Sequence, residues 1–280
     1  MGAVRLSMEL ARADDLDSLE RLGVRATAVR FEPDTSESEA AALGRRYRDA
    51  GIAIVQVGCP RNVSAPDAEV RRDAADALVR ALTLAAAAGA EAVATGPGHR
   101  DPQRVALAFA AHPDNFSEAA LDDLAATCRT VLAAVGRDGP RLLVETGVLS
   151  PLNTLLRASE AVRRVGHPAF GILLDPVNLT TLDNYFDNGS FLTRCVQQLG
   201  PGLGLVHAKD VLMQPHHFTF ALEEVPLGRG ALDYGALLAA LAAADHSAPV
   251  HIEGQGDQAG FAAAVDWLHT IAQRAGVTLV

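Results

Sequence analysis

The chain has little lysine, little cysteine and no long hydrophobic run, and each scarcity excludes a class of protein. Of its 24 basic residues only Lys209 is a lysine. The net charge of −10 would repel a nucleic acid backbone unless basic residues gathered on one face, and the sequence contains no such cluster. We therefore expect no nucleic acid partner.

The three cysteines, Cys59, Cys128 and Cys195, lie far apart and form no CxxC pair, so neither a disulfide framework nor a zinc knuckle is predicted. The apolar run at residues 81–90 is interrupted by Thr83 and is too short to span a bilayer. Residues 1–7 lack the long apolar segment of a signal peptide. These absences favour a cytoplasmic protein with no membrane partner.

What the sequence does contain is a repeated unit, in which a short apolar run is followed by a turn and by a longer stretch with helical periodicity. Hydrophobic residues make up 49% of the 280 residues, enough for a large core. The expected strands are Val4–Met8, Ala26–Phe31, Ile52–Val57, Ala92–Ala94, Leu142–Glu145, Gly171–Asp175, Leu203–His207 and Val250–Glu253. The expected helices are Leu16–Leu22, Ser36–Ala50, Pro66–Ala88, Glu118–Val135, Pro151–Val165, Ser190–Leu199, Tyr234–Ala244 and Gln258–Ala275.

Eight βα units without a linker predict a single-domain α/β fold over residues 1–280, a (β/α)8 TIM barrel. Nearly continuous apolar strands such as Gly-Ile-Leu-Leu are typical of parallel sheets buried on both faces. A doubly wound open sheet is the alternative, but the first strand is not followed by the GxGxxG turn of a dinucleotide site.

Four metal-competent side chains terminate the last four expected strands: Glu145, Asp175, His207 and Glu253. Active sites of TIM barrels lie at the carboxyl ends of the strands, so four neighbouring strands would converge these side chains on one point. An acid or histidine can simply cap a strand, but three carboxylates and an imidazole at one mouth need a cation or shared protons. Mixed oxygen and nitrogen donors without thiolate favour one divalent ion, Mn²⁺, Co²⁺ or Mg²⁺, with Fe²⁺ or Zn²⁺ as alternatives.

The segments Val-Glu145-Thr-Gly, Leu-Asp175-Pro-Val-Asn178, Val-His207-Ala-Lys209-Asp210 and Ile-Glu253-Gly resemble the xylose isomerase-like barrel superfamily, as does the Gly228-Arg229-Gly230 loop. This superfamily includes sugar isomerases, epimerases, inosose and dehydroshikimate dehydratases, and endonuclease IV relatives. The resemblance implies that Glu145, Asp175, His207 and Glu253 are metal ligands and that the two glutamates also act as acid and base. Asn178 departs from the pattern, since many epimerases carry a titratable histidine there.

Other polar residues are candidates for contact with a substrate. Lys209 lies two residues past His207 on the same strand face, where it could donate to a substrate oxygen or form an ion pair. Asn178, His99 in the loop after the fourth strand, Asp210 and Arg229 are further substrate-binding candidates. A loop histidine and a surface arginine are also common without any function.

The ligand set predicts Lewis-acid activation of a carbonyl, and the resemblance implies an isomerase or epimerase that removes a proton next to the carbonyl of a sugar, keto-sugar or cyclitol and forms an enediolate. A lyase, either a keto-sugar or inosose dehydratase or a 3-keto-glycoside-cleaving enzyme, shares this first step and is the alternative. An endonuclease would need a basic groove, which the charge disfavours. The expected partners are a small carbohydrate and, in a homo-oligomer, further copies of the chain.

Overall fold

A computed structural model describes residues 2–10, 16–103, 109–136, 138–214, 216 and 219–280. Eight strands form a closed barrel in the order β11-β2-β3-β4-β5-β6-β7-β8, with parallel neighbours, which confirms the (β/α)8 prediction. These strands are β2 (Leu6–Met8), β3 (Ala26–Val29), β4 (Ala53–Gly58), β5 (Ala92–Thr95), β6 (Arg141–Glu145), β7 (Phe170–Leu174), β8 (Leu203–Ala208) and β11 (Val250–Ile252).

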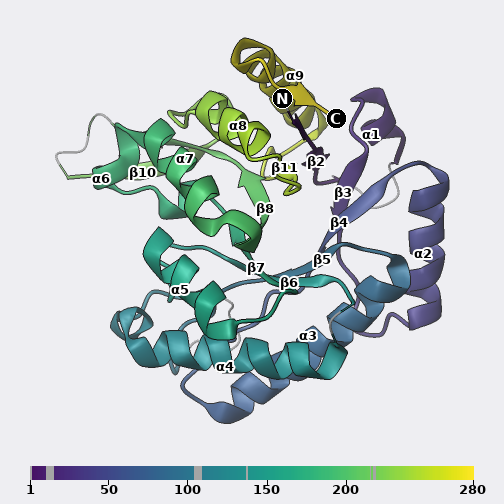
Figure 1. The fold of residues 1–280 in the computed structure, drawn as a ribbon, viewed down its shortest axis with the longest axis vertical. Coiled ribbons are helices and arrows are strands. Elements are labelled where there is room, and N and C mark those ends of the chain that lie inside the picture. Colours follow the sequence, from purple (N-terminus) through teal and green to yellow (C-terminus); the bar gives the residue numbers. More distant parts are fainter. Residues whose placement is uncertain (1, 11–15, 104–108, 137, 215, 217–218) are drawn as a thin grey trace. The chain divides into compact units, whose positions relative to one another are not determined.

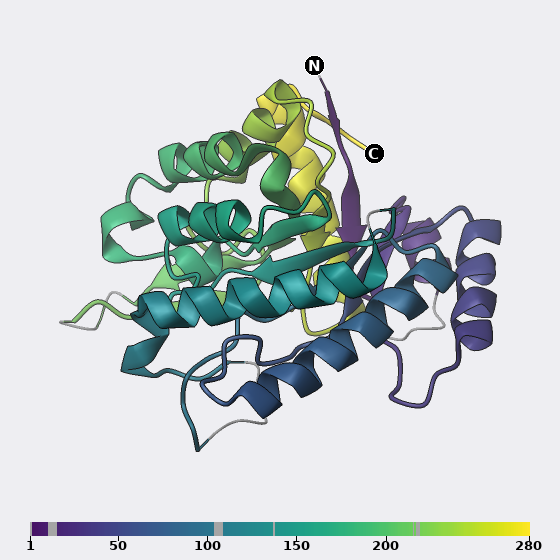
Figure 2. The ribbon, with the colours of Figure 1, turned by 60° about the horizontal axis from the view of Figure 1, so that its bottom comes forward.

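Residues 28–173 form one compact unit of the chain. Four helices of this unit pack against one another in chain order, and Figure 2 shows the long α3 and α4 lying side by side. They are α2 (Glu37–Asp49), α3 (Ala68–Ala88), α4 (Glu118–Val135) and α5 (Leu155–Val165), with the short helix η1 (Pro113–Phe116) before α4.

Residues 1–27 and 174–280 form a second compact unit. In it α7, α8 and α9 pack in succession, as Figure 1 shows in green to yellow. Its helices are α1 (Leu16–Arg21), α6 (Leu182–Tyr185), α7 (Asn188–Leu199), α8 (Tyr234–Ala243) and α9 (Gln258–Ala275), with the short helices η2 (Val177–Leu179) and η3 (Gly200–Gly202).

Burial explains why these segments become strands and helices. All five residues of β7 are buried, as expected for a parallel strand that is covered on both faces. The helices begin at polar caps, for example at Ser36, whose hydroxyl and Glu39 form a capping box at the start of α2. Helix α3 ends at Gly89, which adopts the left-handed conformation at φ 72° that is common for glycine at a helix end.

Two details differ from the expected elements. The first expected strand, Val4–Met8, is split, because β1 (Ala3–Val4) pairs with β12 (Thr278–Leu279) whereas β2 pairs with β11 and β3. An antiparallel hairpin of β9 (Asp210–Met213) and β10 (Leu222–Val225) follows β8. Its exposed Glu223 and Glu224 give the segment no apolar pattern, so the sequence did not indicate a strand there.

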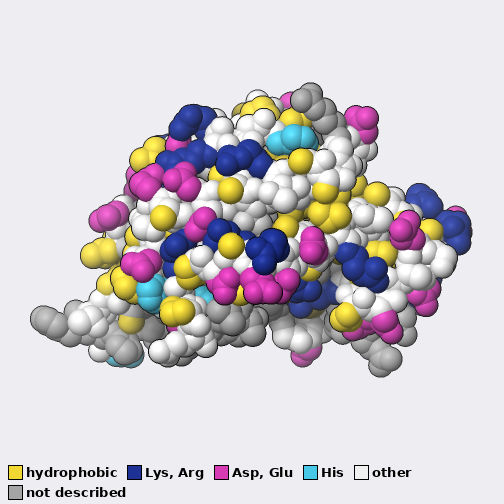
Figure 3. All heavy atoms as spheres, turned by 90° about the horizontal axis from the view of Figure 1, so that it is seen from below, with side chains coloured by type: hydrophobic (Ala, Val, Ile, Leu, Met, Phe, Trp, Pro, Cys, Tyr) yellow, Lys and Arg dark blue, Asp and Glu magenta, His cyan; other side chains and the backbone are white. Residues whose placement is uncertain are grey.

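On the face drawn in Figure 3, basic and acidic side chains lie next to one another. Arg164 of α5, for example, forms ion pairs with Glu118 and Asp122 of α4 and with Glu160 of its own helix. Among the described residues, no helix combines the length and the apolar character needed to cross a bilayer.

Candidate metal and catalytic site

Strands β7, β8 and β11 bring three of the predicted ligands together. Asp175 follows the last residue of β7, His207 lies near the end of β8, and Glu253 follows β11. Their ligand atoms lie within 4.8 Å of one another. Because the register pairs Ala208 with Ile252, Glu253 comes level with the end of β8, where its N–H donates to Ala208 O at 3.5 Å.

The three side chains are largely withdrawn from solvent. Asp175 is fully buried, His207 is 4% exposed, and Glu253 is half-buried. His207 Nδ1 lies 3.0 Å from Glu253 Oε1 and 4.0 Å from Asp175 Oδ2. Two carboxylates and an imidazole at this spacing are a donor set that suits a hard or borderline divalent cation.

Lys209 lies among the same groups. Its Nζ is 2.7 Å from Glu253 Oε1 and 3.0 Å from Asp175 Oδ2, and Glu224 Oε2 is 3.9 Å away. Burial disfavours the charged ammonium, but the two nearer carboxylates outweigh it and raise the pKa of Lys209 above its usual value. Of the two roles expected for Lys209, the structure shows the ion pair, with the ammonium group beside the carboxylates of Asp175 and Glu253.

The same contacts act on Glu253. Burial alone would raise the pKa of its carboxyl group, but the hydrogen bond with His207 and the charges of His207 and Lys209 lower that pKa to about 2. Glu253 is therefore an ionised carboxylate, which both a metal ligand and a proton acceptor require.

Glu145 is the last residue of β6 and is half-buried. It lies in register with Leu173 of β7, two residues before Asp175 in the chain. The expected position at the carboxyl end of its strand is confirmed, and its function as ligand or base remains a prediction.

The substrate-binding candidates have varied surroundings. Asn178 is half-buried in η2, and its backbone N–H donates to Asp175 Oδ1 at 3.1 Å. Arg229 is exposed. Asp210 is buried, and its carboxylate accepts four backbone hydrogen bonds, from Val211, Gly228, Gly230 and Leu232. The structure thus shows Asp210 anchoring a loop, and substrate contact by these three residues remains a prediction.

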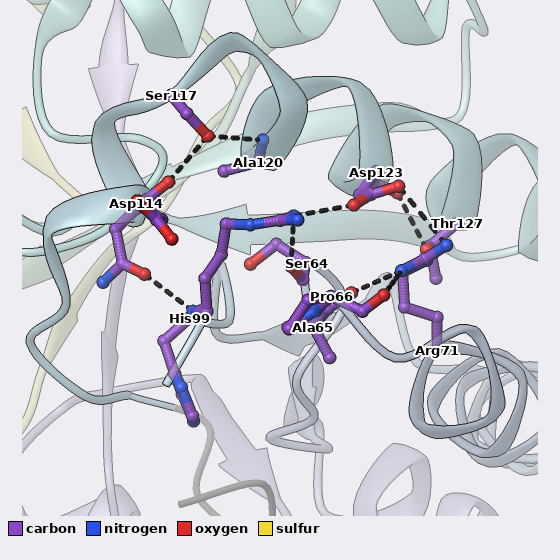
Figure 4. Close-up of polar contacts among 12 residues, drawn as sticks. Ser64, Ala65, Pro66, Arg71, His99, Asp114, Ser117, Ala120, Asp123 and Thr127 are labelled. Atoms are coloured by element: carbon purple, nitrogen blue, oxygen red, sulfur yellow. Dashed lines mark hydrogen bonds and ion pairs between the residues drawn. The ribbon is translucent and has the colours of Figure 1, made fainter. Parts of the chain in front are cut away.

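His99 is buried in the loop after β5, and both its backbone N–H and its backbone carbonyl form hydrogen bonds with one side chain. Asn62 accepts from His99 N at 2.9 Å and donates to His99 O at 3.0 Å. The next residue, Arg100, donates to Asp123 at 2.7 Å and to Ser64 O at 3.2 Å. Figure 4 shows the His99 ring pointing away from these contacts.

A second arginine completes this polar network. Arg71 lies 3.3 Å from the other carboxylate oxygen of Asp123, and its guanidinium also donates to the carbonyls of Ala65 and Pro66 (Figure 4). Asp123 therefore binds Arg71 of α3 and Arg100 of the loop after β5, and both arginines also donate to backbone carbonyls of the loop after β4. Sequence reasoning missed this network, because Arg71, Arg100 and Asp123 resemble ordinary surface charges in the sequence.

His251 was also missed. It lies two residues before Glu253 and is in register with His207 on β8 and with Ser7 on β2, so the three residues form one row across the strands. Its Nδ1 is 2.8 Å from Ser7 Oγ. Burial, with the neighbouring charge of His207, lowers the pKa of His251 to about 3. The alternation Val-His-Ile-Glu could have revealed that His251 shares the face of Glu253.

A match to a family model establishes the protein family to which the chain belongs. The model described as "Xylose isomerase-like TIM barrel" matches residues 9–271. The chain belongs to this family. No curated protein matches it significantly.

Several solved structures share the fold of this chain at low sequence identity. L-ribulose 3-epimerase is 16% identical with a TM-score of 0.74, over 98% of this chain and 96% of that one. A xylose isomerase-like TIM barrel protein from Mycobacterium smegmatis in complex with magnesium is 17% identical (TM-score 0.70), over 97% of each chain. A probable 3-DHS dehydratase from Bacillus anthracis, AsbF, is 16% identical (TM-score 0.65), over 95% of this chain and 98% of that one.

Proposed function

We propose that this protein is a divalent-metal-dependent isomerase or epimerase that acts on a sugar, keto-sugar or cyclitol. The observation that carries the proposal is the convergence of Asp175, His207 and Glu253 within 4.8 Å, with Lys209 against both carboxylates. The family and the fold shared with L-ribulose 3-epimerase support the sugar class.

The metal would be held by Asp175, His207 and Glu253, with Glu145 as a fourth ligand. The position of Glu145 at the end of β6, opposite a residue of β7 that precedes Asp175 by two, supports this assignment. When bound, the divalent ion would supply Lewis-acid polarisation of the substrate carbonyl, which makes the adjacent C–H more acidic. The magnesium complex of the related barrel is compatible with an ion of this type.

The residues of the chain would move the proton. Ionised Glu253 accepts it from the carbon next to the carbonyl, and Lys209 stabilises the negative charge that develops on the substrate oxygen as an enediolate forms. In an epimerase Glu145 returns a proton to the opposite face of that carbon, whereas return to the neighbouring carbon gives aldose–ketose isomerisation. Asn178 and His99 are the proposed contacts to substrate hydroxyls.

A lyase is the second candidate, favoured by the fold shared with the probable dehydratase from Bacillus anthracis. Proton abstraction by Glu253 would be the same, but the enediolate would then expel a leaving group from the β-carbon. Isomerase and lyase therefore differ in the fate of one intermediate.

Metal analysis followed by isotope exchange tests the proposal. The purified protein is analysed for bound divalent metal, loaded with Mn²⁺, Co²⁺ or Mg²⁺, and incubated in D₂O with ketoses, inososes and 3-keto glycosides. We expect metal binding and incorporation of deuterium next to the carbonyl, with product analysis separating isomerase from lyase. Absence of metal binding and of exchange across the panel would contradict both candidates.

A further inference from the structure

The segment at residues 226–232, between β10 and α8, is attached to two strand ends that carry proposed catalytic groups. It follows the β9–β10 hairpin and contains Gly228 and Gly230. We propose that this segment, called the strap below, is a positioning element that holds Lys209 and Glu253 in register, and that Gln255 is a positioning residue anchoring it. The claim that this positioning affects catalysis rests on the proposed function. The claim that the strap positions Lys209 and Glu253 does not.

The first anchor is Asp210, next to Lys209. Asp210 Oδ2 accepts hydrogen bonds from the N–H groups of Gly228 and Gly230, both at 3.0 Å, and Oδ1 accepts from Leu232 N at 3.1 Å. A carboxylate that accepts three backbone bonds from one short segment fixes the path of that segment, because each is a charge-assisted bond in a buried place.

The glycines allow the strap to come this close. A Cβ on Gly230 would lie 2.2 Å from Asp210 Oδ1, and a Cβ on Gly228 would lie 2.8 Å from the ring of Trp267. Gly228 also has φ +84°, which favours glycine. The Gly-x-Gly spacing is therefore explained by contacts of the strap with Asp210 and Trp267.

The second anchor is Gln255, two residues past Glu253. Its buried amide accepts from Leu227 N at 3.1 Å through Oε1 and donates to Glu253 O at 2.8 Å through Nε2. One side chain thus joins the strap to the backbone of the proposed base.

Together the anchors join the ends of β8 and β11. Tyr234, just after the strap, donates from Oη to Lys209 O at 2.5 Å, so the Lys209 backbone is held as well. The distance that depends on this arrangement is the 2.7 Å between Lys209 Nζ and Glu253 Oε1. Outer partners of this kind orient the groups that act on substrate and metal.

The test uses the fact that Lys209 is the only lysine of the chain. Protein grown with ¹⁵N-labelled lysine has a single side-chain ammonium signal, and ion pairs with Asp175 and Glu253 slow its exchange with water. We compare metal-free wild type, Gln255→Leu and Gln255→Glu. The glutamate variant keeps the acceptor for Leu227 N but loses the donor to Glu253 O.

A matched control changes stability away from the strap. Gly166, the left-handed residue after α5 at φ +61°, is replaced by alanine, which lowers stability through backbone strain. We expect Gln255→Leu to shift and broaden the Lys209 signal through faster exchange, Gln255→Glu to have an intermediate effect, and Gly166→Ala to leave the signal unchanged.

Kinetics then test the catalytic consequence. In the metal-loaded enzyme we expect Gln255→Leu to lower kcat for deuterium exchange by about 10- to 100-fold and to weaken metal binding, with a smaller change in the KM for substrate. Gly166→Ala should lower Tm with kcat unchanged.

The outcomes separate the two proposals. If Gln255→Leu leaves the Lys209 signal as it is in wild type, the strap does not position Lys209 and the inference is wrong. If the signal changes but kcat does not, its catalytic part is wrong. If wild type neither binds metal nor exchanges protons, the proposed function fails, while the ammonium signal still decides whether the strap positions Lys209.

Discussion

Glu253 has two roles in the proposed reaction, as a metal ligand and as the base. Its low pKa follows from His207 and Lys209, which both lie within 3.0 Å of Oε1. The same neighbours that keep Glu253 ionised also make it a weaker base in the free protein. For Glu253 to accept a proton from the substrate carbon, its contacts with His207 and Lys209 must therefore weaken when the substrate binds.

Replacing Glu253 by glutamine removes the proton acceptor at nearly unchanged volume. We expect Glu253→Gln to keep the fold by circular dichroism and to lose deuterium incorporation by about 10²- to 10⁴-fold, the usual contribution of a general base. Glu223→Gln is the matched control, because Glu223 is exposed on β10 and its described contact is with Gln214. Full exchange activity in Glu253→Gln would contradict the assignment of the base.

The buried pair of Ser7 and His251 supports the row of side chains beneath the site. We expect Ser7→Ala to destabilise the protein by about 1–3 kcal/mol, because a buried imidazole nitrogen loses its hydrogen-bond partner. Urea unfolding measures this loss, and the exposed Ser190→Ala on α7 serves as a control with an expected change within about 0.5 kcal/mol. Equal stability of the two variants would show that the bond contributes nothing.

Among secondary-structure elements, α2 and α3 make an unusually close contact. A Cβ on Gly44 of α2 would lie 2.0 Å from the carbonyl oxygen of Ala88 at the end of α3. In a helix without this contact, replacing glycine by alanine would increase stability by about 0.5–1 kcal/mol. Overpacking against backbone costs about 1–3 kcal/mol, and a carbonyl group within a helix cannot move aside as a side chain can. The steric cost therefore exceeds the propensity gain.

We accordingly expect Gly44→Ala to lower the free energy of unfolding by about 0.5–2 kcal/mol, which is the overpacking cost less the propensity gain. Denaturant titration measures it. Gly139→Ala is the control, because a Cβ there meets nothing within 4 Å, and it should leave stability unchanged or slightly higher. A stabilised Gly44→Ala protein would mean that the two helices separate readily.

The sequence predicted the elements that follow periodicity and missed those that depend on tertiary contacts. The apolar runs ending at Asp175, His207 and Glu253 identified their strands and the cluster, because strand ends of a barrel meet at one face. The β9–β10 hairpin was missed because Glu223 and Glu224 are solvated. The anchoring role of Asp210 was not predicted either, since its partners are backbone N–H groups 18 and 20 residues away in the sequence.

At the scale of the whole molecule, the boundaries of the two compact units fall inside strands. One boundary lies between Thr27 and Ala28 of β3, and the other between Leu173 and Leu174 of β7. Unfolding of one unit alone would therefore have to divide β3 and β7, and a divided strand exposes unpaired backbone groups. We therefore expect the units to unfold together.

Two buried thiols report on the two units separately. Cys128 in α4 belongs to residues 28–173, and Cys195 in α7 belongs to the other unit. Burial raises the pKa of each thiol to about 12, so both stay protonated and unreactive in the native protein at pH 8. In single-cysteine variants, reaction with a disulfide reagent along a denaturant series should begin at the same concentration for both thiols. Separate midpoints would contradict cooperative unfolding of the barrel.

The same thiols make stability depend on alkaline pH. A group whose pKa is higher in the folded protein than in the unfolded chain stabilises the fold fully below the unfolded value, here about 9, and this contribution is lost as pH rises towards 12. Between pH 8 and 10.5 the free energy of unfolding should therefore fall more steeply in wild type than in a Cys128→Ala/Cys195→Ala variant. Because titration of tyrosines is common to both proteins, the difference between their slopes isolates the thiols. Parallel pH profiles would show that these thiols ionise alike in folded and unfolded chains, in conflict with their burial.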